Sequence, residues 1–280
     1  MPTIKLIADS GSTKTEWCLI KGRKKTVFIT TGMSPYFLNG SQMIEIIERE
    51  VLPILKKVKI EELFYYGTGC GNPENLNMVR KVLAHCFQGV KIHIDTDITG
   101  AARALCGKDK GVVCILGTGS SACYYNGKKI VKNSPGLGYV LGDEGSGAYM
   151  GKKVIQHYLY EIFDGDLRAR FDARYVTSAP EILNSVYKEP FANRYLAGFA
   201  LFLSENRGHY MIENIIEDSL HDFFNTHVNR FKENRKVPVH FTGGVAFGFK
   251  DLLGQIVASY ELIQGNILRN PMDGLIQYHS

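Results

Sequence analysis

The chain of 280 residues is long enough for two domains or one large one, and its 45% hydrophobic and 22% charged residues are ordinary for a globular protein. The net charge of +5 is small and the lysines are scattered, which argues against nucleic-acid binding. No apolar run is long enough to cross a bilayer, so we expect no membrane partner. We also expect no signal peptide, because residues 2–6 lead directly into the first strand.

The cysteines predict a cytoplasmic protein with reduced thiols. They show no paired spacing of the kind that metal sites use, and most fall within predicted strands and helices. The six are Cys18, Cys70, Cys86, Cys106, Cys114 and Cys123.

The chain opens with a predicted β-hairpin whose loop consists of small residues. Residues 9–15 read Asp-Ser-Gly-Ser-Thr-Lys-Thr and lie between an apolar strand, residues 4–8, and a β-rich run, residues 17–20. Backbone N–H groups in such a turn can approach a phosphate closely, and the hydroxyls add donors. Asp9 ends a buried strand and therefore needs solvent or a cation, and beside a phosphate loop its natural partner is hydrated Mg²⁺.

Alternating strands and helices follow the hairpin. We expect a strand over residues 26–31, a helix over 41–55, a strand over 63–66, a helix over 73–86, a strand over 91–94 and a helix over 95–107. The polar stretch 108–111 then marks the domain boundary, which gives a first domain over 1–110 and a second over 111–280.

The second domain begins with a second copy of the hairpin. Residues 117–121 read Gly-Thr-Gly-Ser-Ser and lie between strand patterns at 112–116 and 122–125. Such repetition indicates two domains of one plan. Two loops of this kind facing each other across a cleft would hold a polyphosphate from both sides, so we predict a nucleotide clamp.

The rest of the second domain repeats the first with a long helical insertion, about residues 146–231, before a strand at 238–241. Gly243 and Gly244 follow that strand and precede a helix, where a purine or ribose could rest on exposed backbone. The alternative is a plain strand-to-helix turn with glycines for packing.

Two acidic positions are candidates for catalysis or substrate binding. Asp97 lies at a strand-to-helix junction, where a carboxylate could accept a proton during phosphoryl transfer, although aspartate there is often only a cap. Asp95 is the alternative base. Residues 141–147, Leu-Gly-Asp-Glu-Gly-Ser-Gly, place Asp143 near Mg²⁺ or a sugar, or else serve to cap a helix.

Five segments in this order resemble those of N-acetylglucosamine kinases and related ATPases of the benzoyl-CoA reductase activator type, within the actin, sugar kinase and heat-shock ATPase superfamily. They are residues 9–15, 96–101, 117–120, 141–147 and 242–246, and the resemblance covers nearly the whole chain. It implies an α/β fold of two ribonuclease-H-like domains with an interdomain cleft, ATP and Mg²⁺ as cofactors, and transfer of the γ-phosphoryl group to a sugar hydroxyl.

On this template the site residues are assigned by role. Asp97 matches the general base and Asp9 the magnesium-binding carboxylate. The ATP and phosphate contacts correspond to Ser10, Gly11, Ser12, Thr13, Lys14, Gly117, Thr118, Gly119, Ser120, Gly243 and Gly244. The sugar contacts correspond to Ser34, Tyr36, Thr68, Gly69, Asp97, Ser121, Leu137 and Asp143.

The departures from the family pattern concern the sugar. Ser34-Pro35-Tyr36 and Ser121 stand where the kinases usually have asparagines, and Leu137 stands near the tryptophan of vertebrate members. Lost amides mean lost hydrogen bonds to polar substrates. We therefore expect an amino-sugar kinase whose exact sugar the sequence does not name, and we leave open a homodimer.

Two other functions remain in view. An ATP-driven activator of a CoA-ester dehydratase or reductase would need cysteines for an iron–sulfur cluster between subunits, and neither Cys70 nor Cys123 has Cys-rich surroundings. An ATP-dependent sugar sensor is disfavoured because Asp97 is present. A third function, that of a dinucleotide oxidoreductase, is excluded because residues 117–122 lead into a strand, not a helix.

Overall fold

The computed structural model describes residues 3–56 and 58–280, and the chain divides into two compact α/β units. The first unit consists of Met1–Asp109 with Asn270–Ser280, and the second of Lys110–Arg269. The division after residue 109 falls in the polar stretch where the sequence places a boundary. The final helix, which the sequence assigns to the second domain, belongs to the first unit.

The first unit is built on a sheet with the strand order β3-β2-β1-β4-β5. Its strands are β1 (Lys5–Ser10), β2 (Lys14–Lys21), β3 (Lys24–Thr31), β4 (Glu62–Gly67) and β5 (Lys91–Thr96). β2 is antiparallel to β1 and β3, while β4 runs parallel to β1 and β5 to β4. The carboxyl ends of β1, β3, β4 and β5 therefore meet at one edge of this sheet.

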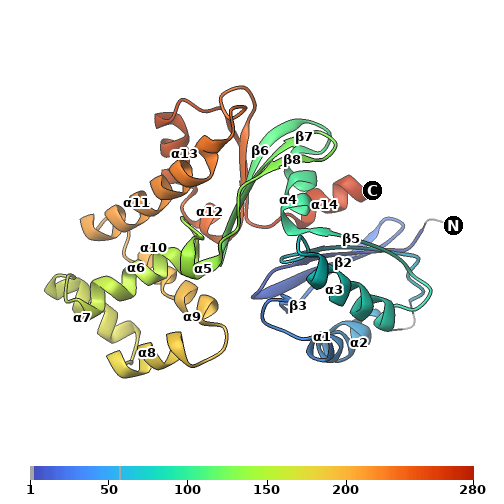
Figure 1. Ribbon diagram of the computed structural model, residues 1–280, viewed down its shortest axis with the longest axis horizontal. Helices are drawn as coiled ribbons and strands as arrows, with labels where there is room; N and C mark the ends of the chain where they lie inside the picture. Colours follow the sequence, from blue (N-terminus) through green and yellow to red (C-terminus); the bar gives the residue numbers. More distant parts are fainter. Residues whose placement is uncertain (1–2, 57) are drawn as a thin grey trace. The chain divides into compact units, whose positions relative to one another are not determined.

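Helices cover both faces of this sheet (Figure 1). They are α1 (Gly40–Ile46), α2 (Leu52–Leu55), α3 (Pro73–Cys86), α4 (Asp97–Cys106) and α14 (Met272–His279). Because side chains alternate along a strand, Leu6 and Ala8 of β1 enter the core beneath α1 and α3, whereas Ile7 packs against Leu275 and Ile276 of α14. The apolar face of α14 is thus part of the core of the first unit.

Two predicted helix boundaries differ from the structure. The helix expected over residues 41–55 is interrupted by a π-helical turn, η1 (Ile47–Val51), and its last turn begins next to Pro53, which lacks an N–H donor. The helix expected from residue 95 begins at Asp97, because Asp95 and Thr96 extend β5.

The second unit repeats the plan of the first. Its sheet has the order β10-β9-β6-β7-β8, with β6 (Lys110–Leu116), β7 (Ser120–Asn126), β8 (Ile130–Asn133), β9 (Val239–Thr242) and β10 (Gln264–Leu268). β7 is antiparallel to β6 and β8, and β9 is parallel to β6 and β10. The central position of β6 matches that of β1, which confirms the internal repeat.

A helical segment separates β8 from β9, as expected. It comprises α5 (Gly138–Leu141), α6 (Gly147–Leu159), α7 (Gly165–Arg174), α8 (Ala179–Tyr187), α9 (Ala192–Gly198), α10 (Ala200–Glu205), α11 (Tyr210–Thr226) and the 3₁₀ turn η2 (Val228–Arg230). After β9 follow α12 (Gly244–Gly248) and α13 (Lys250–Ser259). No helix in the described part of the chain is long and apolar enough to span a bilayer.

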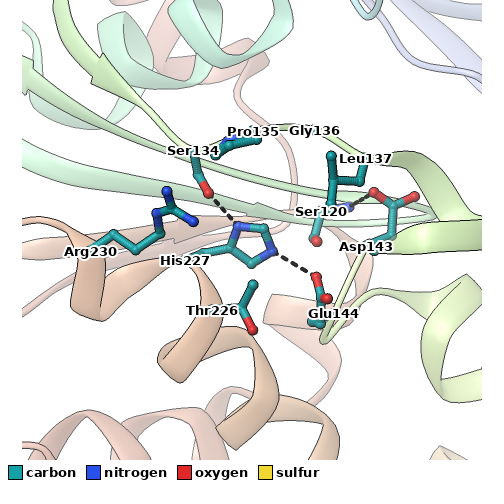
Figure 2. Close-up of a pocket in the computed structure, with 11 residues that line it drawn as sticks. Ser120, Ser134, Pro135, Gly136, Leu137, Asp143, Glu144, Thr226, His227 and Arg230 are labelled. Carbon is teal, nitrogen blue, oxygen red and sulfur yellow. Dashed lines mark hydrogen bonds and ion pairs between the residues drawn. The ribbon is translucent and has the colours of Figure 1, made fainter.

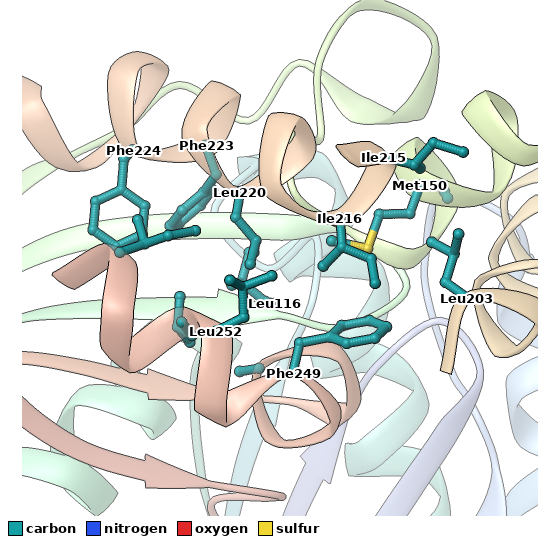
Figure 3. Packing of buried hydrophobic residues seen from close by; sticks show 14 of the residues in the cluster. Leu116, Met150, Leu203, Ile215, Ile216, Leu220, Phe223, Phe224, Phe249 and Leu252 are labelled. Carbon is teal, nitrogen blue, oxygen red and sulfur yellow. The ribbon is translucent and has the colours of Figure 1, made fainter. Parts of the chain in front are cut away.

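The core of the second unit joins these helices to the sheet (Figure 3). Leu220, Phe223 and Phe224 of α11 are fully buried and belong to one cluster with Leu116 of β6 and Leu252 of α13. Burying such side chains contributes roughly 1.5–3 kcal/mol each. α11 is therefore fixed to its sheet, and so is the residue that ends it, His227.

Candidate active site

Three loops and the start of α4 gather where the carboxyl ends of β1, β3, β4 and β5 meet. The loop after β1 folds back through a hydrogen bond from the Gly11 N–H to the Lys14 carbonyl, 3.0 Å. Gly32, directly after β3, lies so close that a Cβ atom there would be 2.6 Å from the carbonyl oxygens of Gly11 and Ser12. Only glycine fits this contact, so the two loops form one rigid edge.

The hydroxyls of the first hairpin loop differ in their surroundings. Ser10 and Thr15 are buried and hydrogen-bond each other at 2.9 Å, and the Ser10 carbonyl accepts the Thr68 N–H. Ser10 therefore joins β1 to the loop after β4, which is a structural role. Ser12, Thr13 and Lys14 are more exposed, and the Lys14 ammonium lies 3.9 Å from Glu16.

Asp9 and Asp97 form an acidic pair at this edge. Burial and the neighbouring carboxylates of Asp97 and Glu16 raise the pKa of Asp9 to about 7. Burial also raises the pKa of Asp97, against hydrogen bonds from the Ile98 amide and the Thr68 hydroxyl. A buried carboxyl whose ionisation a neighbouring carboxylate disfavours is a natural setting for a divalent cation, so Asp9 with Asp97 beside it fits hydrated Mg²⁺.

Asp97 and Asp95 are held differently. Asp97 occupies the first turn of α4, where its carboxylate accepts the Ile98 N–H at 2.8 Å and Thr96 caps the helix. Asp95 precedes the helix, and its carboxylate lies 3.3 Å from the guanidinium of Arg103. Asp95 thus has a cationic partner of its own.

The residues predicted to bind sugar in this unit lie together. A Cβ atom on Gly69 would be 2.9 Å from Pro35 and 3.0 Å from Tyr36, so the loops after β3 and β4 are in contact. Ser34 is buried, and its hydroxyl lacks a hydrogen-bond partner among residues 3–56 and 58–280. The Tyr36 ring is exposed. A buried, unsatisfied hydroxyl beside an exposed ring suits a polar ligand.

In the second unit three glycine-rich segments meet where β6 and β9 end. The Gly147 and Ala148 amides donate to the carbonyls of Gly117 and Thr118, at 2.8 and 3.0 Å. Gly243 has φ +123, and a Cβ atom there would lie 2.2 Å from the Leu116 carbonyl oxygen. The structure therefore brings residues 117–120, 142–147 and 243–244 together. Gly244 opens α12, and no atom lies near its Cβ position.

Asp143 lies against the second hairpin loop. One carboxylate oxygen accepts the Ser120 N–H at 3.4 Å, and a Cβ atom on Gly119 would be 2.9 Å from the other. Burial, and to a smaller extent the Glu144 carboxylate, raises the pKa of Asp143 to about 6. Ser121 continues into β7 opposite Ile115, and Leu137 is exposed beside Gly142.

A cavity of about 50 Å³ opens beside Asp143 and Ser120 (Figure 2). Its wall includes three polar residues that the sequence had not singled out for this site, Ser134, Glu144 and His227. They come from distant parts of the chain, and no local motif marks Ser134 or His227. The Ser120 hydroxyl has no hydrogen-bond partner in the part of the chain that the structure describes.

In that same part of the chain, no three His, Cys, Asp or Glu side chains group as a protein-only metal site would need. Magnesium bound to a nucleotide needs no such group, since it keeps several waters and uses one or two carboxylates. Asp9, with Asp97 beside it, would suffice.

The comparisons with known proteins decide the family. Residues 8–271 match the BadF/BadG/BcrA/BcrD ATPase family. The chain belongs to this ATPase family. The match confirms the resemblance to activator-type ATPase relatives that the sequence motifs indicate.

Two relatives carry kinase names. A solved structure from Porphyromonas gingivalis, described as a candidate N-acetylglucosamine kinase, is 38% identical, covers 98% of both chains and superimposes with a TM-score of 0.93. The N-acetylmuramic acid/N-acetylglucosamine kinase of Clostridium acetobutylicum is 25% identical over 193 residues, 63% of this chain. That match spans only 61% of the curated relative, less than two thirds of its length.

A third comparison concerns the fold alone. A ROK family glucokinase from Streptomyces griseus, solved in complex with glucose and AMPPNP, is 13% identical with a TM-score of 0.60 and covers 98% of this chain and 97% of its own. The α/β architecture of the sugar kinases, expected from the motifs, is confirmed.

Proposed function

We propose that the protein is an ATP-dependent sugar kinase that phosphorylates N-acetylglucosamine or a closely related amino sugar. Its membership of an ATPase family supports nucleotide use. The names of the Porphyromonas and Clostridium relatives support the class of acceptor. The glycine-rich loops after β1 and β6 present N–H groups and hydroxyls of the kind that hold phosphates.

The observation that carries this proposal is the acidic pair Asp9 and Asp97. Asp97 begins α4 directly after β5, near the carboxylate suited to Mg²⁺, and both lie at the edge where the loops after β1, β3 and β4 gather. A kinase of this kind needs a metal-nucleotide anchor and a base within one group of loops. Asp95, paired with Arg103, is less suited to take a proton.

Each residue has a defined task in this mechanism. Asp97 accepts the proton of the attacking sugar hydroxyl, and its raised pKa brings it closer to the value that favours proton transfer near neutrality. The loops of residues 11–13 and 117–120 hold the phosphates of ATP while negative charge shifts during transfer. Gly243 and Gly244 support the adenosine. Bound Mg²⁺ would neutralise phosphate charge from its place at Asp9.

The sugar is selected by side chains that differ from the usual kinase pattern. The buried Ser34 hydroxyl and exposed Tyr36 ring, with Thr68 and Gly69 beside them, take the place of an asparagine-bearing loop. Ser121, Leu137 and Asp143 supply the contacts of the second unit. Hydroxyls in place of amides reach less far, so we expect weaker discrimination between amino sugars that differ at one substituent.

The burial of the cysteines supports the activator function less well than the kinase function. All six cysteines lie in the described part of the chain, and each is buried or half-buried. The pKa of the Cys70 thiol is raised to about 12 by burial and by the nearby aspartates. A cluster shared between two subunits needs thiolates at the surface. We therefore propose the kinase in preference to the activator.

The deciding experiment is a turnover assay with ATP, Mg²⁺ and a panel of sugars: N-acetylglucosamine, glucosamine, N-acetylmuramic acid, N-acetylmannosamine and glucose. ADP release is followed by a coupled assay and sugar phosphate by mass spectrometry. The kinase forms both in equal amounts with at least one N-acetylated sugar. If the rate of ADP release without sugar equals the rate with each sugar of the panel, the proposal is contradicted and an activator ATPase or a sensor is favoured.

A further inference from the structure

Three polar side chains form a continuous hydrogen-bonded row in the second unit (Figure 2). The Ser134 hydroxyl lies 2.5 Å from Nδ1 of His227, and Nε2 of His227 lies 3.0 Å from the Glu144 carboxylate. Ser134 and His227 are 4% and 5% exposed. Burying polar groups so completely is costly unless they are paired, and here each meets a partner.

The chemistry of the partners gives the row a direction. An ionised carboxylate only accepts hydrogen bonds, so Nε2 of His227 carries the proton that is donated to Glu144. In the neutral ring Nδ1 is then an acceptor and receives the hydrogen of the Ser134 hydroxyl. Ser134 is itself fixed, because its backbone N–H donates to the Ala122 carbonyl of β7 at 2.8 Å. His227 thus links β7 and α11 to Glu144.

Glu144 lies between two residues whose backbone conformations must be stabilised by their surroundings. Asp143 before it has φ 57, a left-handed conformation that non-glycine residues keep only when their surroundings impose it. Gly145 after it has φ 71, and a Cβ atom there would be 2.7 Å from Phe223 of α11. The His227–Glu144 hydrogen bond pins the loop to α11 between these two positions.

The same loop supports the second hairpin loop at several points. Asp143 accepts the Ser120 N–H, and the first residues of α6, Gly147 and Ala148, donate to the carbonyls of Gly117 and Thr118. A shift of Glu144 would therefore move the groups that hold residues 117–120. His227 lies outside this set, and its printed hydrogen bond to the loop is the one to Glu144, so we assign its effect to the placement of the loop.

We propose that His227 is a positioning residue for phosphoryl transfer, which holds the loop of residues 142–147, through Glu144, in the geometry that the loop of residues 117–120 requires. This inference rests on the proposed kinase function. Misplacement of reacting groups by about 1 Å can cost on the order of a hundredfold in rate. Because the effect falls on the transition state, the loss should appear in kcat more than in the KM for ATP.

Two conservative variants separate the two hydrogen bonds of His227. In His227→Gln the amide nitrogen can reach the place of Nε2 and still donate to Glu144. In His227→Asn the shorter amide reaches only the place of Nδ1, toward Ser134. We expect the glutamine variant to retain kcat within a few fold and the asparagine variant to lose about ten- to a hundredfold. His221→Asn is the matched control, since His221 lies on α11 but pairs with Tyr260.

Hydrogen exchange provides a second readout that does not depend on activity. At temperatures where all variants are folded, the amides of Ser120, Gly147 and Ala148 should exchange faster in His227→Asn than in His227→Gln. Equal kcat and equal exchange in the two variants would overturn the inference, as would an equal loss in His221→Asn. If the unmodified protein phosphorylates no sugar, the kinase proposal fails, and the exchange comparison alone decides the positioning role.

Discussion

Asp97 is held by the first turn of its own helix, where it accepts the Ile98 N–H and lies within reach of the Thr68 hydroxyl. Asparagine can keep part of this geometry but cannot accept a proton. We therefore expect Asp97→Asn to retain the fold and the affinity for ATP while kcat falls by about a hundred- to ten-thousandfold. Steady-state kinetics with the best sugar of the panel, together with ATP binding by calorimetry, measure both quantities.

Asp95→Asn is the control for this substitution. It removes the ion pair with Arg103, which is partly exposed, and should cost little in turnover. If Asp95→Asn is the inactive variant while Asp97→Asn still turns over, the base has been assigned to the wrong carboxylate.

The raised pKa of Asp143 predicts that the free energy of unfolding depends on pH. Its pKa is raised from 3.8 to about 6 in the folded protein, chiefly by burial, so the folded state binds the proton more tightly than the unfolded chain. This stabilisation is complete below about pH 4 and is lost as the pH rises to about 6. Between about pH 4 and 6 this effect lowers the free energy of unfolding of the wild type by on the order of 1.4 kcal/mol per pH unit. Urea unfolding at pH 4.5 and 7 measures the fall, and the fall should be smaller in Asp143→Asn.

Asp218→Asn, which changes an exposed aspartate of α11, is the matched comparison. It should follow the wild-type pH profile. A pH profile of Asp143→Asn that also matches wild type would show that Asp143 ionises normally in the folded protein.

At the scale of the elements, the turn between β9 and α12 lies close against the backbone at the end of β6. A Cβ atom on Gly243 would be 2.2 Å from the Leu116 carbonyl oxygen, and its φ of +123 already disfavours any side chain. Gly243→Ala should therefore separate β9 from the end of β6 and lower the free energy of unfolding by roughly 2 kcal/mol or more. Denaturant unfolding measures this loss.

The neighbouring glycine provides the control. No atom lies within 4 Å of a Cβ built on Gly244, and this residue begins α12. Gly244→Ala should change stability by less than about 1 kcal/mol and can raise it by stiffening the unfolded chain. Equal losses in the two variants would mean that the turn moves freely and that the contact with Leu116 imposes no constraint.

Local patterns were enough to predict most elements that surround the site. The loops of residues 9–15 and 117–121 follow apolar strands, and the sequence shows this directly. The break in the helix of residues 41–55 was missed because the apolar spacing continues through η1. The link from His227 to Glu144 joins residues 83 positions apart. No short-range periodicity encodes such a pair, so only the packing of α11 on its sheet reveals it.

Over the whole molecule, the repeated order of strands explains why each unit contributes one hairpin loop. A central strand, β1 or β6, has an antiparallel hairpin on one side and parallel strands on the other. This arrangement gathers the loops after the parallel strands at one edge of each sheet, where ligands meet open α/β folds. The expected general base belongs to the first unit and Asp143 to the second, so the proposed reaction needs both units intact.

The first unit is completed by a helix from the far end of the sequence, and this predicts where its stability resides. Leu275 is fully buried on α14 and shares a core with Ile7 and Cys18 of β1 and β2. Leu275→Ala should lower the free energy of unfolding of the first unit by about 2–5 kcal/mol, since it removes buried methyl groups and leaves a cavity. Gln277→Ala, at an exposed position of the same helix, should change this free energy by less than about 0.5 kcal/mol.

Limited proteolysis with mass spectrometry shows which unit opens: in Leu275→Ala, new cleavages should fall within residues 3–109. Cleavage confined to residues 110–269 would mean that α14 stabilises the second unit instead.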